Sequence, residues 1–327
     1  MRTVRPLISS STASAFAIGG TVAAYGAVVT EVQVLGNPAA RGGTGDVERV
    51  VDELRAGGHR AALLRADSAE ASAAAARGAV EAGHDRLVVV GGDGLVRIAV
   101  DAVAGSGITL GIVPQGTGND FARALGLLDG GLDDHVRRAL AESVPVDAMR
   151  TNHGWVASVA TVGFSGDVTA RANDLPWPRG QQRYTVATVL QMPRLRTIRA
   201  RITVDGTTHD ADTTMLSIGN TAYFGGGMRI CPDAQPADGL LQVVVIGDVS
   251  RGTFLRVFPR VFRGGHVRHP DVATYRGRTV VVEATDPDPD GDEVEMWADG
   301  DLLGPLPVTC EVVPGAVQVA GATTGAG

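Results

Sequence analysis

Lysine is absent from this sequence of 327 residues, so all 29 of its basic residues are arginines. This absence excludes a Walker A phosphate-binding loop, the strand lysine of protein kinases and any mechanism through a lysine Schiff base. If the chain binds a nucleotide, its phosphates must therefore be held by backbone amides, by arginine or by a metal ion.

Cysteine and positive charge are also scarce. The two cysteines, Cys231 and Cys310, form neither a disulfide framework nor a Cys-x-x-Cys metal site, which favours a reducing cytoplasm. The net charge of -7 disfavours nucleic acid as a partner, because nucleic-acid binding needs a basic surface. No long hydrophobic run is present either. The charge-free stretch from Pro6 to Thr30 is too rich in Ser, Thr, Gly and Ala for a membrane span. We expect residues 1–30 to be a flexible extension or the product of an upstream start codon.

Glycine, in contrast, is abundant, and two glycine-rich turns organise the chain. Val88–Val90 and Ile108–Val113 are β-branched runs of the kind found in buried parallel strands. The turn GGDG (91–94) follows the first run, the turn GTGND (116–120) follows the second, and a helical pattern follows each turn. A single such turn is usually only a tight connection. Two of them at the carboxyl ends of strands predict a phosphate site, because glycine lets backbone N–H groups approach an anion.

The patterns on either side of these turns predict two domains. Strands and helices alternate over residues 31–148, which is typical of an α/β domain with a parallel sheet. Over residues 149–314, short stretches of alternating apolar residues predict a mainly antiparallel, β-rich domain. We expect the end of the chain, residues 315–327, to be disordered because it is rich in Gly, Ala and Thr. The active site is expected in the cleft between the domains.

PQGTGNDFAR (114–123), following the earlier GGDG, resembles the catalytic domain of the diacylglycerol kinase family, which includes the bacterial soluble lipid kinases. The resemblance implies ATP-dependent phosphorylation of a lipid hydroxyl, with diacylglycerol as the leading acceptor and Mg²⁺ as a cofactor. It implies that Asp93 and Asp120 position magnesium or the acceptor. The residues that it assigns to nucleotide binding in the two turns are Gly91, Gly92, Asp93, Gly94, Gly116, Thr117, Gly118, Asn119 and Asp120.

Two further segments resemble the same family: the first resembles a segment that lies near the nucleotide, and the second resembles a segment that contains catalytic carboxylates. In NPAARGG (37–43), Asn37 is a candidate nucleotide contact, although Asn-Pro is also a common turn opener. In MWADGDLLGPLP (296–307), the resemblance implies that Asp299 and Asp301 are catalytic, with Asp301 in the place of a glutamate. A carboxylate near the cleft is suited to accept the proton of the lipid hydroxyl. Read alone, Asp299-Gly300 is a good hairpin turn.

A third segment, GNTAYFGGGMRICPDAQPADGLLQVVVIG (219–247), resembles the part of the family that binds a structural magnesium. The resemblance implies that the Asp238 carboxylate and the carbonyls of Gln235 and Leu240 are the ligands, and oxygen ligands suit this hard cation. A hairpin loop rich in Pro, Asp and Gly is an equally good interpretation of these residues.

Three residues depart from the family pattern. Leu95, Arg97 and Ile98 stand where the family has Thr, Asn and Glu. The loss of the threonine hydroxyl removes one hydrogen bond, of order ~1 kcal/mol. Two alternatives to a lipid kinase therefore stay open. The first is an NAD kinase of the same fold lineage, against which PQGTGNDFAR argues. The second is a catalytically weak, lipid-binding regulatory protein, which Leu95 and Ile98 favour.

Clustered arginines predict where the chain contacts lipid. Residues 176–202 contain six arginines and no acidic residue. A second group consists of Arg256, Arg260, Arg263 and Arg268, interleaved with Phe258 and Phe262. A solvated surface is the alternative interpretation, but a lipid substrate favours contact with anionic headgroups. We expect a cytoplasmic protein, peripherally associated with the membrane, and a homodimer is a further prediction.

Overall fold

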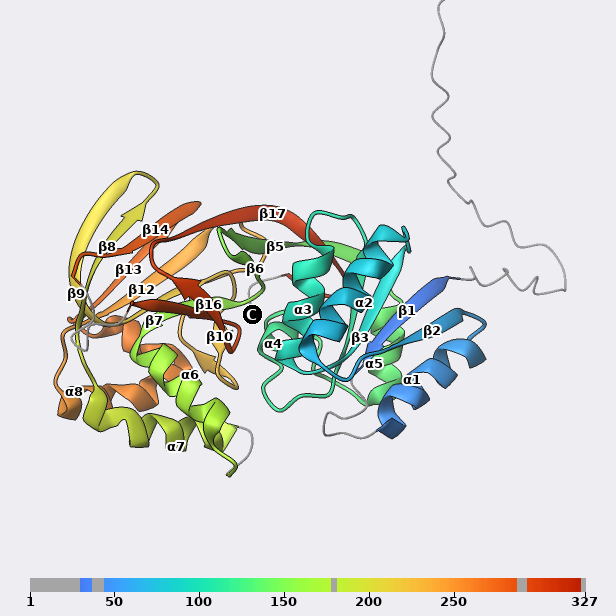
Figure 1. The fold of residues 1–327 in the computed structure, drawn as a ribbon, viewed down its shortest axis with the longest axis horizontal. Helices are drawn as coiled ribbons and strands as arrows, with labels where there is room; N and C mark the ends of the chain where they lie inside the picture. Colours follow the sequence, from blue (N-terminus) through green and yellow to red (C-terminus); the bar gives the residue numbers. More distant parts are fainter. Residues whose placement is uncertain (1–29, 37–43, 178–180, 287–292, 325–327) are drawn as a thin grey trace, which may run out of the picture.

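The computed structural model describes residues 30–36, 44–177, 181–286 and 293–324. These residues form two halves that lie side by side, an N-terminal α/β half and a C-terminal β-rich half (Figure 1). Strands of both halves belong to one 15-stranded sheet. The predicted fold class, an α/β unit with a parallel sheet followed by a mainly antiparallel unit, is confirmed.

The N-terminal half is built on four parallel strands in the order β2-β1-β3-β4. They are β1 (Glu31–Gly36), β2 (Arg60–Arg65), β3 (Arg86–Gly91) and β4 (Thr109–Pro114). The helices that follow or flank them are α1 (Thr44–Ala56), α2 (Ala69–Glu81), α3 (Asp93–Val103), α4 (Asp120–Ala124) and α5 (Leu132–Ala139).

Helices cover both faces of this parallel sheet. Leu87 and Val89 of β3 join a buried cluster with α2 and α3, whereas Val88 and Val90 join a cluster with α1 and α5. Because successive side chains of a strand point to opposite faces, a strand covered on both sides must be apolar at every position. This explains why β3 is a continuous hydrophobic run that ends at the first glycine turn.

The C-terminal half is mostly antiparallel, with β9 (Thr207–Gly219) at its centre, paired with β7, β8 and β12. Its other strands are β6 (Gly154–Val156), β7 (Val159–Gly163), β8 (Ile198–Val204), β10 (Tyr223–Phe224), β11 (Met228–Arg229), β12 (Leu241–Gly247), β13 (Val272–Gly277), β14 (Thr279–Ala284), β15 (Glu295–Ala298) and β16 (Asp301–Pro305).

Helices also cover one side of this half, although the sequence, which predicted a β-rich domain, placed no helix there. They lie along the lower edge of the C-terminal half in Figure 1. They are α6 (Phe164–Asp174), α7 (Gln181–Gln191), η1 (Met192–Arg194), α8 (Arg251–Val257), η2 (Phe258–Arg263) and η3 (Gly265–Arg268). None of the helices within the described ranges is long and apolar enough to cross a bilayer.

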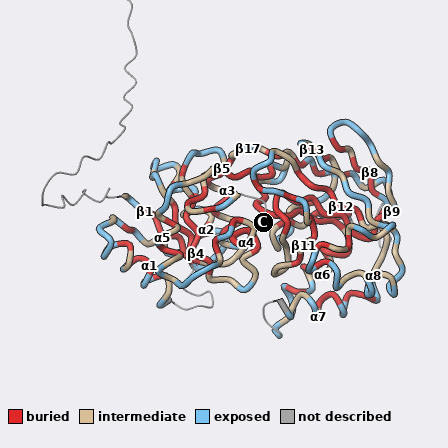
Figure 2. Tube along the Cα trace, turned by 180° about the vertical axis from the view of Figure 1, so that it is seen from behind, coloured by how far each residue is buried: buried red, intermediate tan, exposed pale blue. Residues whose placement is uncertain are grey.

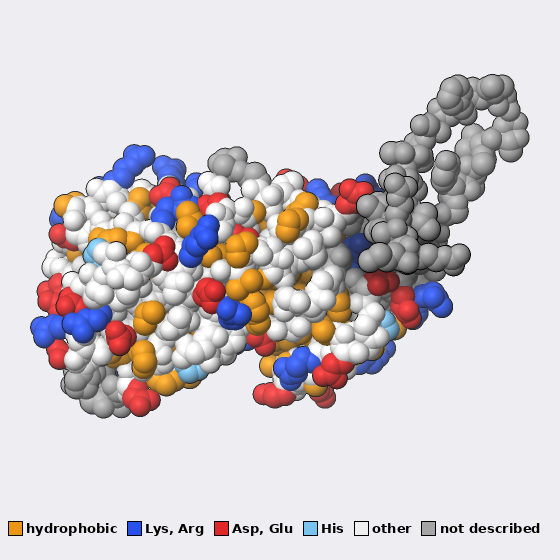
Figure 3. Space-filling model, turned by 90° about the horizontal axis from the view of Figure 1, so that it is seen from above, with side chains coloured by type: hydrophobic (Ala, Val, Ile, Leu, Met, Phe, Trp, Pro, Cys, Tyr) orange, Lys and Arg blue, Asp and Glu red, His pale blue; other side chains and the backbone are white. Residues whose placement is uncertain are grey.

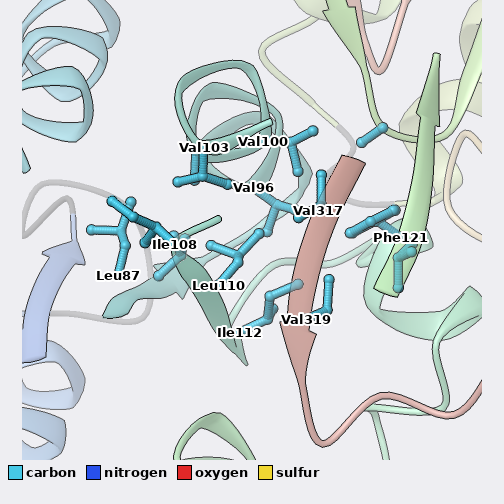
Figure 4. Packing of buried hydrophobic residues seen from close by; sticks show 14 of the residues in the cluster. Leu87, Val96, Val100, Val103, Ile108, Leu110, Ile112, Phe121, Val317 and Val319 are labelled. Carbon is cyan, nitrogen blue, oxygen red and sulfur yellow. The ribbon is translucent and has the colours of Figure 1, made fainter. Parts of the chain in front are cut away.

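Two long antiparallel strands, β5 (Ser143–Thr151) and β17 (Val308–Ala320), connect the halves (Figure 1). The end of β17 pairs with β4, and its Val317 and Val319 are buried in the N-terminal core beside α3 (Figure 4). The prediction of disorder from residue 315 is therefore wrong as far as Ala320. The alternating apolar side chains of this segment are buried in a core contributed by residues more than a hundred positions earlier.

Buried residues follow the strands through the middle of both halves, and exposed residues lie mainly on the outer helices and turns (Figure 2). The cleft described next lies between these two buried cores. The predicted extension over residues 1–30 lies outside the described residues except for Thr30.

Candidate active site

The two glycine turns lie against each other at the carboxyl ends of adjacent strands. β3 and β4 pair in parallel up to Gly91 and Pro114, so both turns leave the same edge of the sheet. A Cβ atom on Gly92 would lie 2.9 Å from the Cα of Gly116. A Cβ on Gly116 would lie 2.5 Å from the Cα of Gly92. These two glycines are needed because the turns pack backbone to backbone.

Gly94 differs from its neighbours because it faces open space. Beyond its own helical turn, no atom of the described residues lies within 4 Å of the position that its Cβ would take, and the residue lines the cleft. It is the second residue of α3, so its backbone N–H is one of the donors that a helix leaves unpaired at its start. A free N–H at a helix N-terminus beside open space is suited to bind an anion.

The second turn is shaped by its own side chains. The Asn119 side-chain oxygen accepts the N–H of Gly116 at 2.9 Å, and its amide nitrogen donates to the Gly116 carbonyl at 2.7 Å. Asn119 itself adopts a left-handed conformation with φ of 50°. Thr117 is exposed and lines the cleft. Asn119 therefore holds the turn in place, while Thr117 is free to contact a ligand.

Two aspartates meet beneath the turns. Asp93 accepts the backbone N–H of Asp120 at 2.6 Å, and Asp120 accepts the N–H of Gly226, from the C-terminal half, at 2.8 Å. Burial, followed by the negative charge of Asp93, raises the pKa of Asp120 to about 6. Burial also raises the pKa of Asp93, against the effect of backbone hydrogen bonds.

The Oδ1 atom of Asp120 is buried and has no hydrogen-bond partner in the described part of the chain. Two neighbouring carboxylates, one with an unpaired oxygen, can supply part of the oxygen ligands of a divalent cation, whose remaining ligands are water and phosphate oxygens. The pair formed by Asp93 and Asp120 therefore fits the magnesium of a magnesium-nucleotide complex.

The third carboxylate, Asp299, is partly buried and fully engaged by the backbone. Its two oxygens accept the N–H groups of Ala157, Ser158 and Val159 at 2.7, 2.9 and 3.2 Å. Burial raises its pKa to about 6, although these hydrogen bonds and the charge of Arg97 act in the opposite direction. Asp299 therefore ties the turn between β15 and β16 to the start of β7.

Asp301, two residues later, is more accessible. Its side chain is 55% exposed, it lines the cleft, and one carboxylate oxygen lies 3.6 Å from Nε of Arg97 on α3. Arg97 thus forms an ion pair across the two halves. Of the two aspartates, Asp301 has the carboxylate that a substrate hydroxyl can reach.

One cleft of about 740 Å³ brings these groups together. Its N-terminal wall contains Gly91, Gly92, Asp93, Gly94, Gly116, Thr117, Gly118 and Asp120. The opposite wall contains Asp299 and Asp301 together with residues that the sequence did not single out: Asn173, Arg183, Tyr184, Tyr223, Phe224 and Trp297. Asn173 and Tyr184 come from α6 and α7, for which no motif gave a signal. The other four lie in segments that the sequence singled out, 176–202, 219–247 and 296–307, but none of them was assigned to the cleft. Asn37 lies outside the described residues.

Comparison with known proteins places the chain in a family. The model of the diacylglycerol kinase catalytic domain matches residues 31–151. The model of the YegS C-terminal NAD kinase beta sandwich-like domain matches residues 157–321. The chain belongs to the diacylglycerol kinase family.

Individual relatives agree with this assignment. A diacylglycerol kinase of Mycobacterium tuberculosis is 40% identical over 248 residues, covering 74% of this chain and 78% of the relative. A diacylglycerol kinase of Bacillus subtilis is 26% identical, covering 68% of this chain and 73% of the relative. A crystal structure of a diacylglycerol kinase from Bacillus anthracis has a similar fold, with a TM-score of 0.67 at 19% identity, covering 90% of this chain and 97% of the other.

The family-derived site for a structural magnesium does not fit this chain as built. Asp238 accepts the N–H of Leu240 at 3.0 Å on one oxygen, and its other oxygen accepts a hydrogen bond from the guanidinium of Arg276. Gln235 is exposed on the same loop. Because a positive charge already contacts the carboxylate, Asp238 does not offer a free oxygen to a second cation.

The departures in the first turn also have a structural explanation. Leu95 packs partly buried against the N-terminal core, and its side chain closely approaches Gly91. Leu95 therefore supports the turn, and because it also lines the cleft, its side chain presents an apolar surface where the family has a hydroxyl.

Proposed function

We propose that this member of the diacylglycerol kinase family is an ATP-dependent lipid kinase that transfers the γ-phosphoryl group to the hydroxyl of diacylglycerol. The observation that carries the proposal is the cleft. One wall offers free amides and two carboxylates suited to a magnesium-nucleotide, and the other offers an accessible carboxylate next to an apolar pocket. The relatives named diacylglycerol kinase support the same acceptor.

On the nucleotide side, the N–H of Gly94 binds a phosphate oxygen. Thr117 lines the same cleft, and its hydroxyl is a second donor to the phosphates. Asp93 and Asp120 would hold Mg²⁺, which neutralises the phosphate charge when it is bound. Positioning and charge stabilisation account for most of catalysis in phosphoryl transfer, so a chain without lysine can support it.

On the acceptor side, Asp301 accepts the proton of the lipid hydroxyl. A carboxylate in this role contributes roughly 100-fold or more to the rate. Arg97 holds the Asp301 carboxylate beside the cleft, and Asp299 fixes the turn from which Asp301 extends.

An apolar pocket next to the cleft is suited to an acyl chain. Thr169, Tyr184 and Phe224 line both the pocket and the cleft, so the two spaces adjoin. Most other lining side chains are aliphatic or aromatic hydrocarbons, among them Phe254 and Phe258 of α8 and η2. The pocket has a volume of about 50 Å³ here, so we expect its helical wall to move outward when lipid enters.

The outer surface of the same wall fits a membrane. Leu255 and Phe262 are 51% and 37% exposed. They lie among four arginines that form no ion pair with any residue in the described ranges: Arg256, Arg260, Arg263 and Arg268. Exposed apolar and unpaired basic side chains together favour contact with anionic lipid. We propose a peripheral enzyme on the cytoplasmic face of the membrane, where ATP is supplied.

The end of the other arginine-rich segment, residues 176–202, has a different arrangement. Arg199 pairs with Asp212 and Asp286, and Arg201 pairs with Asp210. On the face shown in Figure 3, basic and acidic side chains are interspersed in this way. These two arginines of the predicted lipid contact are therefore neutralised within the protein, and we assign the membrane surface to α7, where Val189 and Leu190 are exposed, together with α8, η2 and η3.

The test is to incubate the purified protein with labelled ATP and vesicles that contain diacylglycerol and anionic lipid, in parallel with soluble NAD. We expect labelled phosphatidic acid, with no labelled NADP, and loss of the product in Asp301→Asn. Phosphorylation of NAD alone would favour an NAD kinase. ATP binding without transfer to any lipid would favour the regulatory protein.

A further inference from the structure

The loop from Asp233 to Leu240 connects the β-rich half to the strands that join the two halves. The Pro236 carbonyl accepts the N–H of Asp147 on β5 at 2.8 Å. In return, Asp147 accepts the N–H groups of Gly239 and of Gly315, on β17, at 2.8 and 2.9 Å. Asp147 is 3% exposed, so these bonds are shielded from water. The conformation of the loop therefore affects how β5 and β17 are held together.

Two contacts fix the other side of this loop. Asp233 and Gln242 exchange hydrogen bonds, with the Asp233 N–H donating to the Gln242 side chain at 2.8 Å. Arg276 is directly opposite Gln242 in the β12–β13 ladder, so its side chain starts beside the loop. Its guanidinium donates to Asp238, whose side chain is only 23% exposed.

The residue that would bind a cation is therefore already neutralised from within the chain. One oxygen of Asp238 accepts the Leu240 N–H and the other accepts the Arg276 guanidinium. Magnesium requires close to six oxygen ligands in octahedral geometry, and a guanidinium on the same carboxylate repels it. In the described ranges, no group of three or more His, Cys, Asp or Glu side chains offers a replacement site.

We propose that the guanidinium of Arg276 takes the place of a divalent cation at Asp238, so that the Asp233–Leu240 loop is held without metal. The positive charge is covalently built into β13, and it does not depend on the magnesium concentration. This role concerns the stability of the fold and is independent of the proposed kinase activity. Removal of the guanidinium should leave Asp238 and the nearby carbonyls of Gln235 and Leu240 able to take up the ion.

The experiment is thermal unfolding of the full chain without nucleotide, in EDTA and in increasing Mg²⁺. Wild-type protein and Arg276→Met are compared with Arg278→Met, which removes an exposed arginine at the bend between β13 and β14 that forms no ion pair with the described residues. Any magnesium taken up by Asp93 and Asp120 affects all three proteins alike. The quantity to compare is therefore the Tm shift that Mg²⁺ causes in Arg276→Met against the shift in the other two proteins.

We expect Arg276→Met to lower Tm in EDTA by roughly 2–4 °C and to recover most of this loss in millimolar Mg²⁺. Wild type and Arg278→Met should both show the same, smaller increase in Tm on addition of Mg²⁺. The added change Asp238→Asn should abolish the recovery. If Arg276→Met does not fold, Arg276→Gln, which keeps the polar side chain without its charge, serves in the same comparison. A wild-type response as large as that of the variant, or a variant without recovery, would overturn the proposal.

Discussion

Gly94 is the position at which nucleotide binding and stability can be separated most cleanly. The resemblance assigned Gly92, Gly94 and Gly118 alike to nucleotide binding. In the structure a Cβ at Gly92 meets the backbone of Gly116 at 2.9 Å, and one at Gly118 meets the Asp93 carboxylate at 2.6 Å. Replacing either residue therefore disturbs protein packing. Only at Gly94, among these three, does a new side chain enter open cleft.

The expected magnitudes follow from these surroundings. Gly94 has helical backbone and no close neighbour, so Gly94→Ala should stabilise the fold by up to about 1 kcal/mol. The same methyl group would occupy the space of a phosphate oxygen, and we expect ATP to bind at least ~10-fold more weakly, a loss of about 1.4 kcal/mol. Gly92→Ala should instead destabilise the fold by about 1–3 kcal/mol, because ordinary carbon–carbon contacts need roughly 3.5–4.0 Å.

The assay combines isothermal titration with a non-hydrolysable ATP analogue and thermal unfolding of the same samples. Gly94→Ala should raise Tm slightly while it weakens nucleotide binding, and Gly94→Val should weaken binding further. Gly92→Ala should lower Tm by several degrees, at roughly 2–4 °C per kcal/mol. Wild-type nucleotide affinity in Gly94→Val would refute the assignment of phosphate to the start of α3. An unchanged Tm in Gly92→Ala would refute the close contact of the turns.

Three further predictions concern the carboxylates and the membrane surface. Asp120→Asn should stabilise the fold near pH 7 by up to about 3 kcal/mol. The reason is that the pKa of this buried carboxyl is raised, so the stability of the wild type falls as pH rises from about 4 to about 6. Denaturant unfolding across that pH range should show no such fall in stability in the variant, and magnesium-nucleotide binding should weaken. A wild type that is more stable than the variant at pH 7 would contradict the raised pKa of Asp120. Asp301→Asn should lower turnover at least ~100-fold with nucleotide affinity intact. Asp299→Asn should also lower turnover, but with a loss of about 1–3 kcal/mol in stability, because the three N–H groups that it binds lose one carboxylate oxygen as acceptor. Normal turnover in both Asp301→Asn and Asp299→Asn would exclude these residues from the mechanism. Replacing Arg260 and Arg263 by serine should weaken sedimentation with anionic vesicles roughly 10-fold or more, at about 1 kcal/mol per arginine. The matched change of Arg199 and Arg201, which are paired with aspartates, should have little effect, and equal effects would argue against a localised membrane surface.

The sequence alone determined the part of the site that is local in the chain. The apolar runs predicted around Val88–Val90 and Ile108–Val113 are the strands β3 and β4, and both end at the predicted glycine turns. Strands covered on both faces are continuously apolar, and a turn into a helix at such a strand end requires glycine, so composition and periodicity carry this information. The juxtaposition of the two turns followed because parallel strands end at the same edge of a sheet.

Tertiary structure decided everything that depends on distant partners. The burial of β17 in the N-terminal core, the three N–H groups around Asp299 and the Arg276 contact at Asp238 each join residues tens to hundreds of positions apart. No periodicity records such pairings. The helices α6, α7 and α8 were missed because strand-like alternation dominates the segments around them. They form the apolar pocket only by packing on a sheet assembled from the whole C-terminal half. For this reason Asp299 and Asp301 could be named from the sequence, whereas the apolar pocket beside them could not.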